Sequence, residues 1–157
     1  MKVRSLMLII LVGCVSLFAA CSYITDFVVV NQSDQTVEVR YKIKHFPGPF
    51  APPVAPATIA NSRLSTKGGQ EWIELTSDQY QLDEENRTVI VELASYQALR
   101  IARMHHYMGH EYAGDAEDFP LEEVIVTGEQ GDLKLVGQQA RVTFLEMSRV
   151  LYTLTYK

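Results

Sequence analysis

The sequence has very little cysteine, and both of its cysteines, Cys14 and Cys21, lie within the first 21 of 157 residues. The rest of the chain therefore has no pair with which to form an internal disulfide bond, and a domain of this size folds without one. Clusters of lysine or arginine, which proteins that bind nucleic acids display, are also missing. After Lys2 and Arg4 the chain carries twelve basic and nineteen acidic residues. We therefore expect no nucleic-acid partner.

Several common signatures of catalysis are absent as well. The sequence contains no GxSxG, no HExxH, and no phosphate-binding GxGxxG or GxxxxGK[ST] pattern. These patterns place nucleophiles, metal ligands and phosphate groups in familiar enzyme classes. The sequence thus favours a non-enzymatic binding or structural module without a cofactor, and it leaves a hydrolytic or metal-dependent activity open.

The only long apolar run stands at the start of the chain. A short positive segment precedes the apolar stretch Leu6–Leu17, and two alanines directly precede Cys21. This is the layout of a cleavable secretory signal, and the run is shorter than the ~20 apolar residues that cross a membrane. We predict a signal peptide over residues 1–20 and a single domain over residues 21–157.

The junction Phe18-Ala19-Ala20-Cys21 resembles the lipobox of bacterial lipoproteins. In that family the cysteine thiol receives a diacylglycerol group, a dedicated peptidase cuts before the cysteine, and the freed amine is usually acylated. The resemblance covers the signal and its junction only. It implies a membrane anchor at Cys21 and, because Ser22 follows in place of aspartate, export to the outer membrane, where the domain would face the periplasm.

A second match to the same motif lies upstream, at Leu11-Val12-Gly13-Cys14. Cleavage there would leave a very short apolar segment in the signal and an apolar remnant on the mature chain. Cys21 is therefore favoured over Cys14 as the lipidated residue.

Beyond the signal, the sequence predicts an all-β fold. Ile24–Val30 is β-branched and apolar, residues 31–34 form a turn cluster, and Thr36–Lys44 alternates between apolar and charged residues. We interpret these segments as a β-hairpin whose second strand has one buried face and one wet face. Further strands are predicted at Glu71–Leu75, Thr88–Leu93, Ala98–Arg103, Glu123–Thr127, Leu133–Val136, Ala140–Leu145 and Val150–Tyr156.

Many short strands with turn residues between them are typical of a sandwich or barrel. We predict a single antiparallel β-sandwich of the immunoglobulin-like or Greek-key type. Two stretches also fit helices: Tyr96–Met108, which Gly109 would end, and Ala140–Tyr156. Strands are favoured in both, because valine, threonine and tyrosine are frequent in the second and the first fits the regular strand spacing.

Five of the six prolines lie between residues 45 and 70. Proline cannot donate a hydrogen bond to a β-ladder, so this segment is predicted to be a long loop. It is either a functional loop or an extended crossover between the sheets, and the second interpretation is favoured.

Three of the four histidines lie in one short stretch, His105, His106 and His110, followed by Glu111. Imidazole and carboxylate groups are ordinary ligands of zinc and copper. Their spacing matches no known zinc signature, and a strand would point the two adjacent histidines to opposite faces. We expect surface histidines, with a metal-binding protein or metal-dependent envelope enzyme as the alternative. The favoured hypothesis is a lipid-anchored envelope protein that binds a protein or a glycan.

Overall fold

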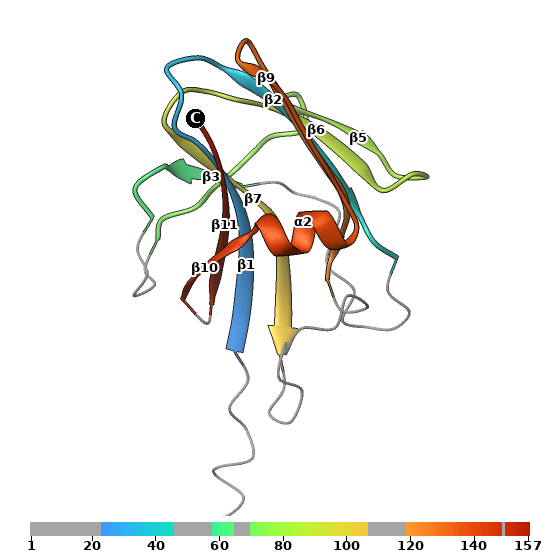
Figure 1. Ribbon diagram of the computed structural model, residues 1–157. Coiled ribbons are helices and arrows are strands. Elements are labelled where there is room, and N and C mark those ends of the chain that lie inside the picture. The colour runs from blue at the N-terminus through green and yellow to red at the C-terminus, as the bar shows by residue number, and fades with distance from the viewer. Residues whose placement is uncertain (1–22, 46–57, 65–69, 107–118, 149) are drawn as a thin grey trace, which may run out of the picture.

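The computed structural model describes residues 23–45, 58–64, 70–106, 119–148 and 150–157. Within these ranges the chain forms two stacked β-sheets and one short helix (Figure 1). The elements are β1 (Tyr23–Asn31), β2 (Val37–Ile43), β3 (Thr58–Asn61), β4 (Ile73–Glu74), β5 (Tyr80–Asp83), β6 (Thr88–Leu93), β7 (Gln97–His106), β8 (Leu121–Gly128), β9 (Gly131–Val136), α2 (Gln138–Thr143), β10 (Leu145–Ser148) and β11 (Leu151–Tyr156).

One sheet has six strands in the order β10-β11-β1-β7-β3-β4, and the other has five in the order β5-β6-β2-β8-β9. Neighbouring strands run antiparallel, except that β1 and β11 are parallel. The predicted all-β sandwich is confirmed.

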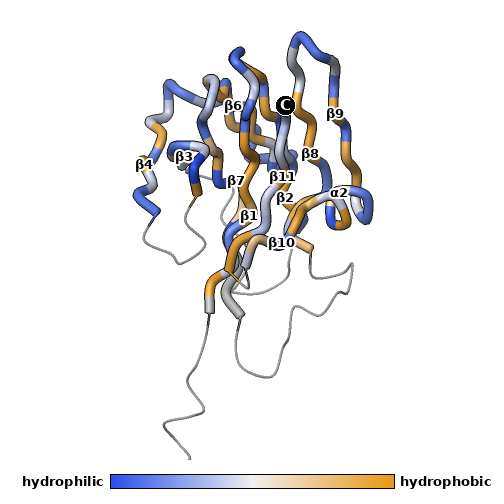
Figure 2. The backbone as a smooth tube through the Cα atoms, turned by 60° about the vertical axis from the view of Figure 1, so that its left-hand side comes forward, coloured by the Kyte–Doolittle hydropathy of each residue, from blue (hydrophilic) through white to orange (hydrophobic). Residues whose placement is uncertain are grey.

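The main core lies between the sheets. Its largest fully buried side chains include Tyr41, Ile43 and Leu121 from the five-stranded sheet and Phe27 and Leu99 from the six-stranded sheet. Figure 2 shows hydrophobic residues recurring along the strands of both sheets. Burial of apolar surface contributes roughly 25 cal/mol per Å², so this inner layer is the main source of stability.

The predicted hairpin between the first two strands is wrong, because β1 and β2 lie in different sheets. β1 pairs with β7 and β11, whereas β2 pairs with β6 and β8. The sequence of each strand explains the difference. Residues 27–30 are all buried, which requires cover on both faces of the strand, whereas β2 alternates between buried and more exposed residues.

Cover on the outer face of the six-stranded sheet comes partly from the segment between β3 and β4. Val28, Val30 and Leu151 form a second buried cluster on that face, and Leu64 and Trp72 pack against it. Had β1 paired with β2 in the five-stranded sheet, Val28 and Val30 would face solvent beside the exposed side chains of β2.

The predicted strand over Ala140–Leu145 is also wrong. Residues 138–143 form α2, and β10 begins only at Leu145. In the helix Ala140 and Phe144 are four residues apart and both are buried, while Val142 is 68% exposed. A strand would have turned Val142 toward the same side as Ala140 and Phe144. The connection between the sheets is therefore helical, because a helical turn buries Ala140 and Phe144 and leaves Val142 exposed.

The predicted loop over residues 45–70 contains a strand. β3 pairs with β7 on one side and with β4 on the other. All five prolines of this segment lie between residues 47 and 56, outside the described residues, so β3 itself contains no proline to interrupt its hydrogen bonds.

Two further strands differ from the sequence-based expectation. β7 confirms the predicted strand at Ala98–Arg103 over the helical alternative and extends it to residues 97–106. β5, at Tyr80–Asp83, is a strand that was not predicted from the sequence.

Asn31 joins the two sheets at the end of β1. Its side chain is fully buried, and its amide nitrogen donates to the carbonyl oxygens of Gln35 (2.7 Å), Leu93 (3.1 Å) and Ala94 (3.1 Å). Its side-chain oxygen accepts hydrogen bonds from the amide and hydroxyl of Ser33 at 3.0 and 2.7 Å. Because Leu93 ends a strand of the other sheet, this one side chain links the ends of the two sheets by hydrogen bonds.

Candidate functional site

The outer face of the five-stranded sheet carries charged and polar side chains. On β2 the outward residues are Glu38, Arg40 and Lys42, and they alternate with the buried inward residues. The alternation along residues 36–44 predicted this wet face. Strand pairing places Ile90 and Ile125 on either side of Arg40, so Arg40 lies in the middle of the face.

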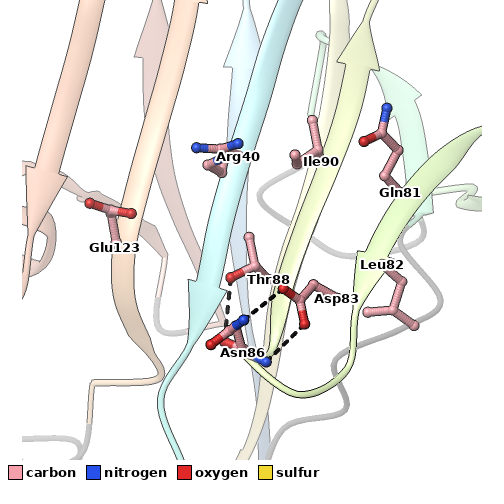
Figure 3. Close-up of a pocket in the computed structure, with 8 residues that line it drawn as sticks. All are labelled: Arg40, Gln81, Leu82, Asp83, Asn86, Thr88, Ile90 and Glu123. Carbon is pink, nitrogen blue, oxygen red and sulfur yellow. Dashed lines mark hydrogen bonds between the residues drawn. The ribbon is translucent and has the colours of Figure 1, made fainter.

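A hollow of about 460 Å³ lies on this face, and Figure 3 shows its side chains. They come from β2, β6, β8, β5 and the turn after β5. The lining residues are Arg40, Gln81, Leu82, Asp83, Asn86, Thr88, Ile90 and Glu123. The hollow is therefore bounded by amide, hydroxyl, carboxylate and guanidinium groups.

The turn between β5 and β6 is held by hydrogen bonds between two of these lining residues. The backbone amide of Asn86 donates to Asp83 Oδ1 at 3.0 Å, and the side-chain amide of Asn86 donates to Oδ2 at 2.7 Å. These two bonds, the side-chain bond first, lower the pKa of the Asp83 carboxyl below its ordinary value. Asp83 is therefore a carboxylate at neutral pH and an acceptor at the edge of the hollow.

Arg40 differs from the lysines around it. Lys42 pairs with Glu122 and Lys134 pairs with Glu123, both at 3.0 Å. Within the described part of the chain, Arg40 forms no ion pair. Its guanidinium group offers five N–H donors in a fixed planar arrangement, so this face can bind a ligand rich in hydrogen-bond acceptors.

A second hollow, of about 350 Å³, lies beside α2 at the edge of the sandwich. Its walls include Phe27, Phe119 and Phe144, but these rings are at most 5% exposed. Phe27 packs edge-on against Phe119 at 5.4 Å and against Phe144 at 5.8 Å, and it stacks on Tyr152 at 5.4 Å. Because the rings pack against one another, they leave little aromatic surface for a ligand. This hollow is therefore the outer surface of the core.

The residues predicted from the sequence as sites lie largely outside the described residues. This holds for Cys14, Cys21, His110 and Glu111. The backbone of β7 includes His105 and the next residue, but their side chains are outside the description. Among the described side chains, no group of three or more His, Cys, Asp or Glu residues could hold a metal ion. The metal site stays a prediction.

Comparisons with protein-family models, with curated protein sequences and with solved structures gave no match. Within the described residues, no helix has the length and apolar character needed to cross a bilayer.

Proposed function

We propose that this chain is a lipid-anchored protein of the cell envelope, a non-enzymatic binding or structural module held at the outer membrane by acyl chains on Cys21. The proposal rests on the lipobox resemblance of residues 18–21, and one structural observation supports it: β1 begins at Tyr23, two residues after that cysteine, and pairs with a neighbouring strand on each side. The anchor would thus be joined directly to a central strand. Force on the lipid would be carried by two β-ladders without an intervening tether.

The lipid anchor is tested by mass spectrometry of the mature protein purified from membranes. We expect an N-terminus at Cys21 with diacylglycerol attached to its thiol. Replacing Cys21→Ser should abolish acylation and release the protein from the membrane, whereas the matched variant Cys14→Ser should be processed normally. Acylation at Cys14, or an unmodified mature N-terminus, would contradict the proposal.

The open face of the five-stranded sheet is the proposed binding surface, for a glycan or a polar protein surface of the envelope. Support comes from Arg40 and the polar side chains of the hollow in Figure 3. Charge reversal at Arg40→Glu should remove partners captured from detergent-solubilised envelopes. Arg63→Glu, an equal charge change at an exposed residue next to β3, is the control. Capture that both variants leave unchanged would exclude this face.

A further inference from the structure

Exposed apolar side chains gather at one end of the six-stranded sheet. Leu145 and Met147, both on the edge strand β10, are 66% and 51% exposed, and Val150 in the following turn and Ile24 near the start of β1 are also exposed. We name these four residues the apolar end. Exposed large hydrophobic residues that cluster, in contrast to scattered ones, mark a contact surface.

Strand pairing places the four residues on neighbouring strands, with Leu145 four residues farther along the sheet than Ile24, because Leu145 pairs with Thr153 and Thr153 pairs with Val28. Leu151 lies beside Asp26 of β1 on one side and beside Ser148 of β10 on the other. The amide of Asp26 also donates to the carbonyl oxygen of Val150 at 2.9 Å. Neighbouring strands are ~4.8 Å apart, so the apolar end spans three adjacent strands. Figure 1 shows β10 and the beginning of β1 at the same, lower end of the molecule.

The proposed anchor lies at this same end. Tyr23 follows Cys21 by two residues, and an extended chain covers at most ~3.6 Å per residue. The first residue of β1 would thus be held within about 7 Å of the lipid-bearing cysteine. We propose that the apolar end rests in the interfacial layer of the membrane that holds the anchor; this rests on the lipid anchor proposed above.

The charges around the apolar end favour apolar contact over electrostatic attraction. The chain after the signal is acidic, so anionic lipids would repel the domain as a whole. Asp26, the carboxylate nearest to Ile24 along the strand, pairs with Arg103 at 2.8 Å and is mostly buried. Glu146 faces the hollow that Phe27 helps to line. On uncharged lipids, membrane contact should therefore depend little on ionic strength.

This contact fixes the orientation of the domain. Tyr96, just before β7, lies at the far end of the six-stranded sheet, because strand pairing places Ala98 beside Val30 near the end of β1. At ~3.3 Å per residue along β1, that end is roughly 25 Å from the membrane surface. The open face of the five-stranded sheet then stands on the side of the domain, free of the bilayer.

The test uses the full lipidated protein in phosphatidylcholine vesicles, with bromine on the acyl chains as a short-range quencher. Trp72→Phe removes the single tryptophan of the chain, and one tryptophan is then introduced, either by Met147→Trp or by Tyr96→Trp. Both host positions are more than half exposed. We expect the Met147→Trp protein to lose most of its fluorescence in brominated vesicles, at low and at high salt, and the Tyr96→Trp protein to lose almost none.

Flotation with the vesicles and mass spectrometry of the same samples separate the two proposals. An acylated protein that floats but shows equal, weak quenching at both positions overturns the membrane contact and leaves the anchor standing. If such a protein also forms a cross-linked dimer through β10, the apolar end contacts a second copy of the chain. This outcome also overturns the membrane contact. A protein without acyl chains that does not float overturns both proposals.

Discussion

The two sheets of this protein differ in how they are covered. The six-stranded sheet is buried on both faces around β1, where Phe27 faces the main core and Val28 faces the second cluster. The five-stranded sheet is buried on one face only, and its outer face carries charged and polar side chains. The difference shows in the sequences, because β1 has the apolar run residues 27–30 while β2 alternates.

This comparison separates stability from binding. A residue that points outward from β1 lies in a packed layer, and a residue that points outward from β2 lies in water. Substitutions on the two outer faces should therefore have unequal effects on folding. The open face can therefore vary in chemistry at little cost in stability.

The largest effect is expected where the two sheets meet, at Asn31. Asn31→Ala leaves the carbonyl oxygens of Leu93 and Ala94 without this donor, at a cost of about 2–3 kcal/mol. Asn31→Asp should cost more, because its carboxylate would face those same carbonyl oxygens. Urea denaturation measures both. The control Asn86→Ala, in an exposed turn, should cost under about 1 kcal/mol. Equal losses of stability at the two asparagines would contradict the role of Asn31 in joining the two sheets.

The outer faces are compared directly by Val28→Ala and Ile90→Ala. Val28 is fully buried, and losing its two methyl groups should cost about 2 kcal/mol. Ile90 points outward from β6 and is only partly buried, so its replacement should cost well under half as much, although it removes more atoms. The measurement is the shift in the denaturation midpoint. A larger loss at Ile90 would show that the outer face of the five-stranded sheet is covered.

The buried face of β2 is tested by pH. Burial, and to a smaller extent the charge of Tyr80, raise the pKa of Tyr41 well above its ordinary value of 10.0. Because the folded-state pKa exceeds that of the unfolded chain, this contribution is complete below pH 10 and declines as the pH rises further. At pH 11 the loss is about 1.4 kcal/mol. Tyr41→Phe should reduce the alkaline loss of stability, and the exposed control Tyr96→Phe should not; identical profiles for all three proteins would contradict this.

The smallest effect is expected for the ion pairs on the two outer faces. Asp26 lies 2.8 Å from Arg103 and 3.8 Å from Arg100, and it is partly buried, as Arg100 is. Burial lowers the pKa of Arg100 and the charge of Asp26 raises it. Asp26→Asn should cost about 1 kcal/mol, between the values for exposed and buried pairs.

The control for that variant is Glu123→Gln, which removes the partner of Lys134 on the open face. Exposed pairs contribute a few tenths of a kcal/mol, so thermal melting should barely change. If 1 M salt weakens the folded state equally in both variants and in the wild type, the two outer faces do not differ electrostatically.

The sequence by itself determined the fold class and the character of single strands. Alternation along β2 predicted its wet face, where Arg40 and the hollow are found, because side chains of a strand alternate wherever the strand lies. The strands predicted at Glu123–Thr127 and Leu133–Val136 correspond to β8 and β9 for a similar local reason. The lipobox resemblance of residues 18–21 is equally local, and it remains the basis for proposing an anchor.

Only the tertiary structure decided which strands are neighbours. The turn after β1 fits a hairpin, yet β1 pairs with β11, more than a hundred residues away in sequence, because only a sheet covered on both faces accepts its unbroken apolar run. The same physics set the helix at residues 138–143, where the core accepts Ala140 and Phe144 but not Val142. Asp83 and Arg40 meet at one hollow only through the β5-β6-β2 pairing. The pairing of distant strands depends on burying the apolar faces of all strands at the same time. A short stretch of sequence therefore cannot show which strands are neighbours.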